Sequence, residues 1–192
     1  MIEGRNGITA NTPKNILFGA GTIHKNLKYA STWNFAETIV GATNGGSKLS
    51  IVPELYDVPV DGANVAVKGL KVKTGETATM EVNFTELSVD LIKAAVLGAE
   101  GSSEDSTLDV VIPKADIALG DYWENVAFVG KTLEGKPVIA ILENALVTSG
   151  FETEGKNKES ATGTYTFTCH ADQAAESFDV LPWKIYYPTA TA

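Results

Sequence analysis

The sequence predicts a mainly β protein, an antiparallel β-sandwich or half-barrel with one flanking α-helix and a long extended arm between two strands. Three observations predict this fold class. Threonine, valine and isoleucine alternate with polar residues in many short segments, and 18 glycines interrupt these segments. Only one segment has the apolar spacing of an amphipathic helix. The strand segments number about eight and are joined mostly by hairpins, which is typical of an antiparallel sheet folded on itself.

The composition describes one globular domain with an acidic balance of charge. The chain has 192 residues, of which 44% are hydrophobic and 20% charged, and its formal net charge is −9. We expect a single domain over residues 1–192, with a flexible N-terminus at 1–12. A net acidic chain is not expected to grip nucleic-acid phosphates or anionic membranes. We also expect neither a membrane-spanning helix nor a secretory signal, because the apolar runs are short and the N-terminus is polar.

The first strand is expected to begin at residues 15–17. A Gly-Ala-Gly run at 19–21 then interrupts it. Residues 23–29 then continue this strand past a bulge or form a second strand. Residues 32–40 alternate apolar and polar side chains, which suits a strand or a strand-like arm. The two glycines favour a kink over a nucleotide-binding loop, because neither a third glycine nor a helix follows them.

Residues 43–62 are predicted to form a long arm. The segment is extended and partly apolar, and prolines interrupt it, so it is a poor central strand. Its candidate inter-subunit contact residues are Leu49, Ile51, Pro53, Leu55, Tyr56 and Val58. These side chains can be buried on the domain itself or on a neighbouring subunit. The second is the sharper hypothesis, since the exposed edges of an open sandwich invite pairing with another chain.

A hairpin is predicted after the arm. Apolar residues alternate in 65–72 and again in 80–84, with a phase slip at Gly69 that is typical of a β-bulge. Thr74-Gly75 lies between the two runs and is predicted to make the turn.

The one predicted helix begins after Ser88 and ends near Leu97. Ser88 is a favoured N-cap residue, and Gly98 stands where a glycine often ends a helix. The core stripe expected from the spacing is Val89, Ile92 and Val96. A loop is expected at 98–106.

The C-terminal half is expected to supply most of the central sheet. Residues 126–132 and 138–146 predict a hairpin, and its 138–142 stretch is apolar on both faces, so it should be covered on both sides. Residues 152–163 predict a polar, solvated loop. One face of the next strand carries Tyr165, Phe167 and Cys169. Residues 178–187 predict the last strand.

The sequence offers no motif for catalysis or for binding a metal or cofactor. Cys169, His170 and Asp172 are close in sequence. In a strand, however, Cys169 and His170 point to opposite faces, which favours a core cysteine beside a surface histidine. We therefore expect no enzyme activity, no catalytic residue, no cofactor and no metal.

Four segments together carry a likeness to a known family. They are the opening strand at 15–23, the glycine-rich turn at 41–46 with the arm behind it, the stretch 67–88 with its helix, and the ending 182–188. Over most of its length the chain resembles the major tail proteins, which form the tail tubes of long-tailed, non-contractile bacteriophages and related prophages.

The resemblance implies a β-sandwich with a flanking helix, six subunits per ring, and rings stacked into a tube through which the genome passes. The implied partners are further copies of the chain and the tape-measure, tail-terminator and tail-tip proteins. The implied location is the virion tail, assembled in the host bacterial cytoplasm. DNA would pass through the lumen without specific binding, and the net negative charge predicts that Asp and Glu are enriched on the inner face.

Two alternatives stay open. The first is a monomeric β-sandwich binding module, for carbohydrate or protein, that uses the loops at 98–105 and 152–163. Its missing feature is exposed aromatic residues, because Trp33, Trp123 and Trp183 are each explained as core or interface residues. The second is an enzyme, for which the sequence supplies no polar constellation.

Overall fold

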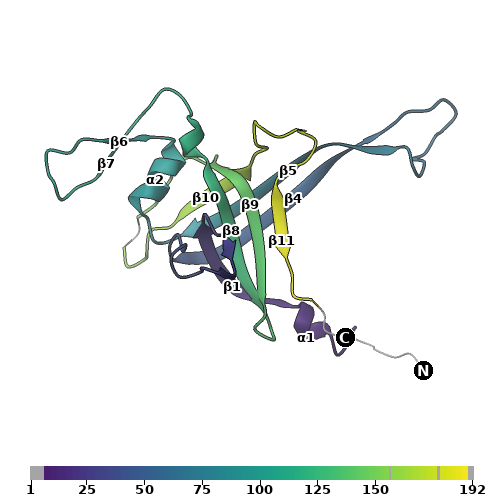
Figure 1. Ribbon diagram of the computed structural model, residues 1–192, viewed down its shortest axis with the longest axis horizontal. Helices are drawn as coiled ribbons and strands as arrows, with labels where there is room; N and C mark the ends of the chain where they lie inside the picture. The colour runs from purple at the N-terminus through teal and green to yellow at the C-terminus, as the bar shows by residue number, and fades with distance from the viewer. Residues whose placement is uncertain (1–6, 156, 177, 190–192) are drawn as a thin grey trace.

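The computed structural model describes residues 7–155, 157–176 and 178–189, and its centre is one curved antiparallel sheet (Figure 1). The strand order is β1-β8-β9-β10-β5-β4, and β11 also pairs with β9. These strands are β1 (Leu17–Lys25), β4 (Thr43–Asp57), β5 (Lys71–Phe84), β8 (Trp123–Thr132), β9 (Pro137–Val147), β10 (Gly163–Cys169) and β11 (Trp183–Tyr186). The predicted mainly β, antiparallel half-barrel is therefore confirmed.

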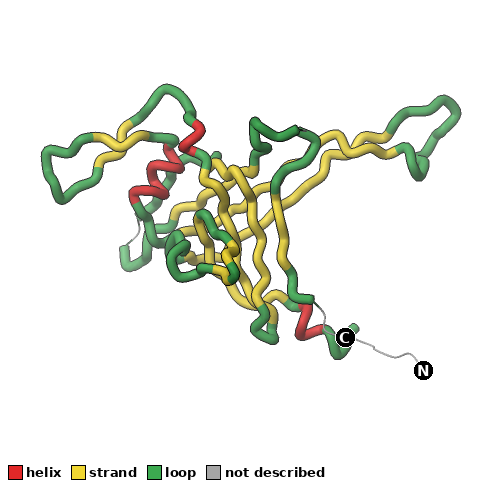
Figure 2. The backbone as a smooth tube through the Cα atoms, viewed as in Figure 1, coloured by secondary structure: helices red, strands yellow, loops and turns green. Residues whose placement is uncertain are grey.

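Smaller elements surround the sheet. They are α1 (Thr12–Asn15), β2 (Tyr29–Ala30), β3 (Thr32–Trp33), α2 (Val89–Val96), β6 (Ala99–Gly101), β7 (Val110–Ile112) and the 3-10 turn η1 (Leu119–Asp121). Two extensions leave the body in opposite directions, the β6–β7 pair on one side and the end of the β4–β5 hairpin on the other (Figures 1 and 2).

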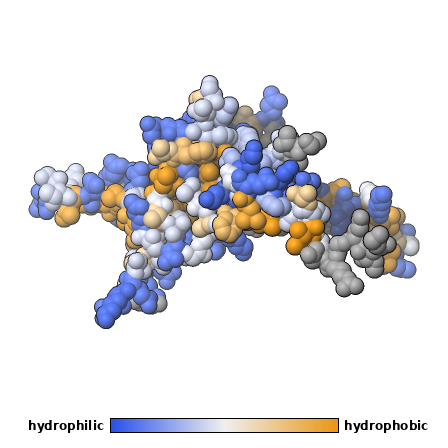
Figure 3. Space-filling view, turned by 90° about the horizontal axis from the view of Figure 1, so that it is seen from below, coloured by the Kyte–Doolittle hydropathy of each residue, from blue (hydrophilic) through white to orange (hydrophobic). Residues whose placement is uncertain are grey.

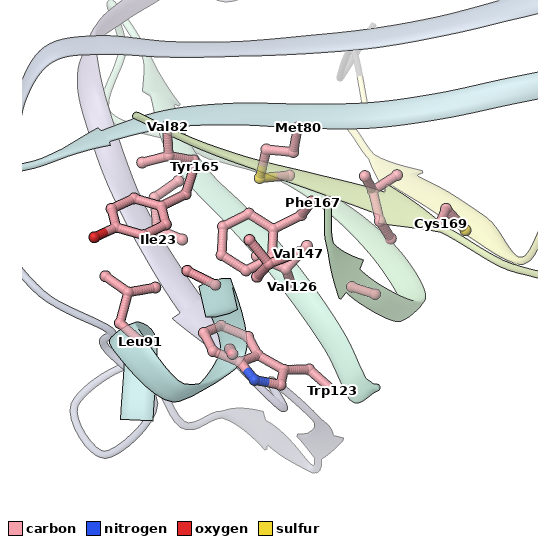
Figure 4. Close-up of a cluster of buried hydrophobic side chains, with 14 of the residues drawn as sticks. Ile23, Met80, Val82, Leu91, Trp123, Val126, Val147, Tyr165, Phe167 and Cys169 are labelled. Carbon is pink, nitrogen blue, oxygen red and sulfur yellow. The ribbon is translucent and has the colours of Figure 1, made fainter. Parts of the chain in front are cut away.

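The main core lies between the curved sheet and α2. Tyr165 and Phe167 of β10 are fully buried there, and Leu91 of α2 faces them (Figure 4). A second, smaller cluster lies on the opposite face of β8 and β9 around Ile139 and Ile141. Because β9 contributes to both clusters, residues 138–142 are buried on both faces, as their sequence predicts.

A bulge in β1 explains the paired glycines. The register of β1 against β8 shifts between Phe18 and Thr22. The strand therefore continues past the bulge, which is the first of the two predicted alternatives. Gly21 has a φ of +69°, and a Cβ there would lie 2.4 Å from the Phe128 ring. Glycine is thus required both by the backbone conformation and by the close approach of the ring.

The predicted turn at Thr74-Gly75 is wrong. The predicted hairpin would fold the two halves of β5 onto each other. Instead, β5 passes through these residues without turning and pairs with β4 along its length. Glu54 pairs with Gly75 and Leu55 with Lys73, which leaves Thr74 as the extra residue of a bulge. The loop that reverses the chain is 58–70.

The predicted helix forms, but its buried face differs. Ser88 is the N-cap, and its Oγ accepts a hydrogen bond of 3.2 Å from the backbone N–H of Leu91. The buried residues are Leu91, Ala94 and Ala95 instead of Val89, Ile92 and Val96. The left-handed residue at the helix end is Leu97, whereas Gly98 allows a close approach: a Cβ there would lie 2.8 Å from Val111.

Three other predicted segments differ from the structure in extent or type. In 32–40 only β3 is a strand, although Ile39 forms an isolated bridge with His24. The loop predicted at 98–106 contains β6, which pairs with β7. The last strand covers Trp183–Tyr186 rather than 178–187, and these four residues are the ones in register with β9.

Candidate assembly surface

The outer part of the β4–β5 hairpin forms a distal arm, which we define as residues 54–75. Every residue from 54 to 74 except Leu70 is exposed, and the hairpin here extends beyond the body of the molecule (Figure 2). The inner part is different. Ile51 packs against the main core, and Met80 and Val82 of β5 are fully buried. The hairpin therefore joins a core-forming root to an arm with no core of its own.

The distal arm exposes large apolar side chains. Seven of them are between 40% and 78% exposed: Leu55, Tyr56, Val58, Val60, Val65, Val67 and Val72. A shallow pocket of about 290 Å³ at the tip is lined mainly by valines, alanines and Leu70. The space-filling view shows hydrophobic (orange) surface on the body and at the end of the molecule that carries the arm (Figure 3).

The charges of the distal arm cancel. Three acidic residues (Glu54, Asp57 and Asp61) stand against three lysines (Lys68, Lys71 and Lys73), whereas the whole chain carries −9. The arm thus has no net charge and exposes many apolar side chains, although the protein as a whole is acidic. A surface of this kind marks a protein contact more often than it marks ordinary solvent-facing structure.

The arm is held together by few interactions of its own. The Val58 N–H donates to the Leu70 carbonyl at 2.8 Å, and Lys71 pairs with Asp57 at 3.0 Å. Both charged partners are about half exposed, so this ion pair contributes little to stability. A two-stranded hairpin without a packed face is marginally stable in water.

A carboxylate fixes the root of the arm to the C-terminal segment. Glu76 accepts hydrogen bonds from Lys73 and from the indole N–H of Trp183. These bonds, with that from Lys73 as the larger cause, hold the pKa of Glu76 below its ordinary value. The arm therefore leaves the body at a defined point, between Pro53 and Glu76.

The predicted contact residues divide between root and arm. Leu49 is 36% exposed and Ile51 is half-buried, so both belong to the sheet. Pro53, Leu55, Tyr56 and Val58 are exposed on or next to the distal arm. The predicted arm ended at residue 62, so sequence reasoning missed the returning side of the arm, residues 63–72. The apparent turn at Thr74-Gly75 assigned the valines of this side to a core hairpin.

The edges of the main sheet are unequal. Residues 38–40 cover part of β1, where the Val40 N–H donates to the Ile23 carbonyl at 2.9 Å. Among the strands that the structure describes, none pairs with the outer edge of β4. A long free edge is a template for pairing with another chain.

Two residues with reactive side chains, Cys169 and His170, make contacts to backbone carbonyls. The thiol of Cys169 is buried and donates to the Glu143 carbonyl at 3.1 Å, and burial raises its pKa to about 12. The Nδ1 atom of His170 lies 2.9 Å from the Thr168 carbonyl. Within the described residues, no three His, Cys, Asp or Glu side chains are arranged to hold a metal ion.

The two loops considered for a binding module carry no aromatic side chain. Residues 98–105 lie in the β6–β7 extension, and the described residues of 152–163 are mostly exposed. Exposed rings lie elsewhere, among them Tyr29 and Tyr186, which sequence reasoning did not single out as site residues.

No protein-family model and no curated protein matches this chain. Among the helices of the described residues, none combines the length and the apolar character needed to cross a bilayer.

Proposed function

We propose that this chain is a structural subunit of a bacteriophage tail tube. In this proposal, copies of the chain assemble into rings, six per ring as the family resemblance implies, and the rings stack into the conduit for DNA. The observation that carries the proposal is the distal arm, which exposes apolar side chains, has no net charge and has no core of its own.

The energetics of the arm favour a protein partner. Burying an apolar side chain of this size contributes about 1.5–3 kcal/mol, and the arm leaves seven of them exposed. A partner that covers only some of them offsets a substantial part of the entropy lost on association. The arm is therefore better explained as one half of an interface than as a solvated loop.

The geometry of the sheet favours a second copy of the chain as that partner. The free edge of β4 and the partly covered edge of β1 are different surfaces at opposite ends of one sheet. A contact between unlike surfaces of identical subunits repeats head to tail, and it closes into a ring or continues as a filament. Both outcomes belong to a tube.

The remaining features of the proposal follow from the family resemblance. The chain would act in the virion tail after assembly in the host bacterial cytoplasm, with the tape-measure, tail-terminator and tail-tip proteins as further partners. A net charge of −9 is compatible with DNA sliding through the lumen without being held.

A shortened arm tests the proposal. Pro53 and Glu76 are direct cross-strand partners, so replacing residues 54–75 by Asn-Gly closes the hairpin with a two-residue turn. We expect the native chain to form rings or tubes in electron micrographs as its concentration rises. The shortened variant should stay a monomer in sedimentation velocity, with a β-type circular dichroism spectrum and a cooperative thermal transition that show it is folded.

Point variants supply the matched comparison. Val67→Asp places a charge on the arm, and Leu133→Asp places one on the β8–β9 turn at similar exposure, 45% against 48%. We expect Val67→Asp to block assembly and Leu133→Asp to permit it. A native chain that stays monomeric at every concentration and ionic strength, or a shortened variant that still assembles, would overturn the proposal.

A further inference from the structure

A groove with aromatic walls lies on the face of the sheet opposite the main core. Three rings line it: Tyr29 of β2, Trp33 of β3 and Tyr186 of β11. The ring centroids of Tyr29 and Trp33 are 5.2 Å apart, and those of Trp33 and Tyr186 are also 5.2 Å apart. The groove has a volume of about 510 Å³, within the usual range for small-ligand sites.

The rings are accessible from solvent. Tyr29 is 64% exposed and Tyr186 is 44% exposed, while Trp33 is half-buried between them. The side chain of Ile141 also lines the groove and belongs to the second core cluster. The aromatic walls are therefore anchored on the sheet rather than carried by a free loop.

Polar groups at the rim are paired and neutral in sum. Lys28 forms an ion pair with Glu124, and Lys184 forms one with Glu143 at 2.5 Å. The four side chains are between 34% and 67% exposed, so their remaining hydrogen-bonding capacity faces solvent. Two positive and two negative groups leave the rim with no net charge.

Asn125 lines the groove, but both polar atoms of its side chain already bond to the backbone of Leu27. Its Oδ1 accepts from the Leu27 N–H at 2.9 Å, and its Nδ2 donates to the Leu27 carbonyl at 3.2 Å. These two buried bonds hold the chain just before Tyr29 against β8. The position of the Tyr29 wall is thus fixed by a residue of the sheet.

We propose that this groove binds a neutral oligosaccharide. The negative faces of aromatic rings attract the C–H groups on the flat side of a sugar ring. Carboxylates, ammonium groups and phenol hydroxyls at the rim supply both acceptors and donors for sugar hydroxyls. A nucleotide or another anion is disfavoured because each lysine is already neutralised by a glutamate. An apolar ligand is disfavoured because it would desolvate the two ion pairs.

The groove does not depend on the tail-tube proposal. Its lining residues come from β2, β3, β8, β9, β11 and the adjoining residues 27–28, and none lies in the distal arm. Loss of assembly in an arm variant therefore leaves the groove intact, and loss of sugar binding in a groove variant leaves the arm intact.

Titration of the full-length chain with cellotetraose and with chitotetraose tests the groove. Backbone and indole N–H signals are followed by nuclear magnetic resonance up to about 10 mM sugar, which detects binding in the millimolar range. We expect saturable shifts for at least one of the two sugars, centred on Tyr29, Trp33 and Tyr186. The double variant Tyr29→Ala, Tyr186→Ala should weaken binding by about tenfold or more.

Two matched variants separate stacking from general damage. The double variant Tyr29→Phe, Tyr186→Phe keeps both rings and should retain most of the binding. Tyr56→Ala removes a ring of similar exposure, 51%, from the distal arm and should bind as the native chain does. Absence of saturable shifts with both sugars, or shifts centred outside the groove, would overturn the proposal. It would also be overturned if the Tyr29→Ala, Tyr186→Ala variant bound sugar normally and instead changed the oligomeric state.

Discussion

At the scale of single residues, Tyr165 has two opposite effects on the stability of the core. Its ring is fully buried and meets Phe84 edge to face with centroids 5.7 Å apart. Its hydroxyl has no hydrogen-bond partner among the residues that the structure describes, and burial raises its pKa. An unpaired buried hydroxyl lowers stability, whereas the ring itself contributes to it.

We expect Tyr165→Phe to raise the free energy of unfolding by about 1 kcal/mol, because it removes the unpaired hydroxyl and keeps the ring. Urea denaturation followed by circular dichroism measures the change. The control is Tyr122→Phe at a half-buried site, where we expect a change within about 0.5 kcal/mol. Destabilisation by Tyr165→Phe would contradict this account of the core.

His24 links stability to pH. It is buried, with Nε2 lying 2.8 Å from Thr22 Oγ1 and Nδ1 lying 2.9 Å from Thr38 Oγ1. The Thr38 hydroxyl donates to the Asn34 carbonyl at 2.8 Å, so it accepts from Nδ1–H of a neutral ring. Burial lowers the pKa of His24 below its ordinary value of 6.5.

We therefore expect stability to fall as the pH drops below about 6.5, since the unfolded state then binds the proton more readily than the folded state. The free energy of unfolding is compared at pH 7.5 and pH 5 for the native chain and for His24→Gln. The variant should lose part of the pH dependence. An identical pH dependence in both proteins would exclude His24 as its source.

At the scale of elements, α2 depends on its N-cap. Ser88→Ala removes the acceptor for the Leu91 N–H and should lower the free energy of unfolding by about 1 kcal/mol. Ser88→Asp keeps an acceptor and places a negative charge at the helix start, so it should retain the native value. Thermal unfolding of the three proteins checks this, and equal loss in both variants would contradict it.

The elements also show what local sequence decides. The β8–β9 hairpin follows from the sequence because its two strands are neighbours in the chain. The buried face of β10 follows from its own alternation of side chains, although its longer pairing is with β5, far away in the chain. The Thr74-Gly75 turn was wrong because β5 pairs with a strand whose register only the folded sheet defines. The helix face was wrong because Ala94 and Ala95, small and weakly hydrophobic, allow closer contact than the larger Val96.

The candidate sites were predictable to different degrees. The arm is visible in sequence, because prolines and apolar residues together exclude an internal strand. Its returning valines were not recognised, since they alternate as core strands do. The aromatic groove was invisible, because Tyr29 and Tyr186 are far apart in the chain and meet only through the pairing of β11 with β9.

At the scale of the whole molecule, the net charge of −9 predicts the character of the inner face of the proposed tube. An acidic inner face repels DNA phosphates, whereas a basic one would hold them. We expect a cryo-electron microscopy map of the tube to place more Asp and Glu than Lys and Arg on the lumen. A basic lumen would contradict the prediction.

Because the arm has no core of its own, its backbone would become ordered only when a neighbouring subunit covers it. An arm that a neighbour stabilises should have backbone amides that exchange quickly with solvent in the free subunit and slowly after assembly. Hydrogen exchange at residues 54–75 would then depend on protein concentration, while exchange in β8 and β9 would not. In the proposed tube, each subunit would complete its folding only when the next one arrives, so the growing end would always carry the least ordered arms.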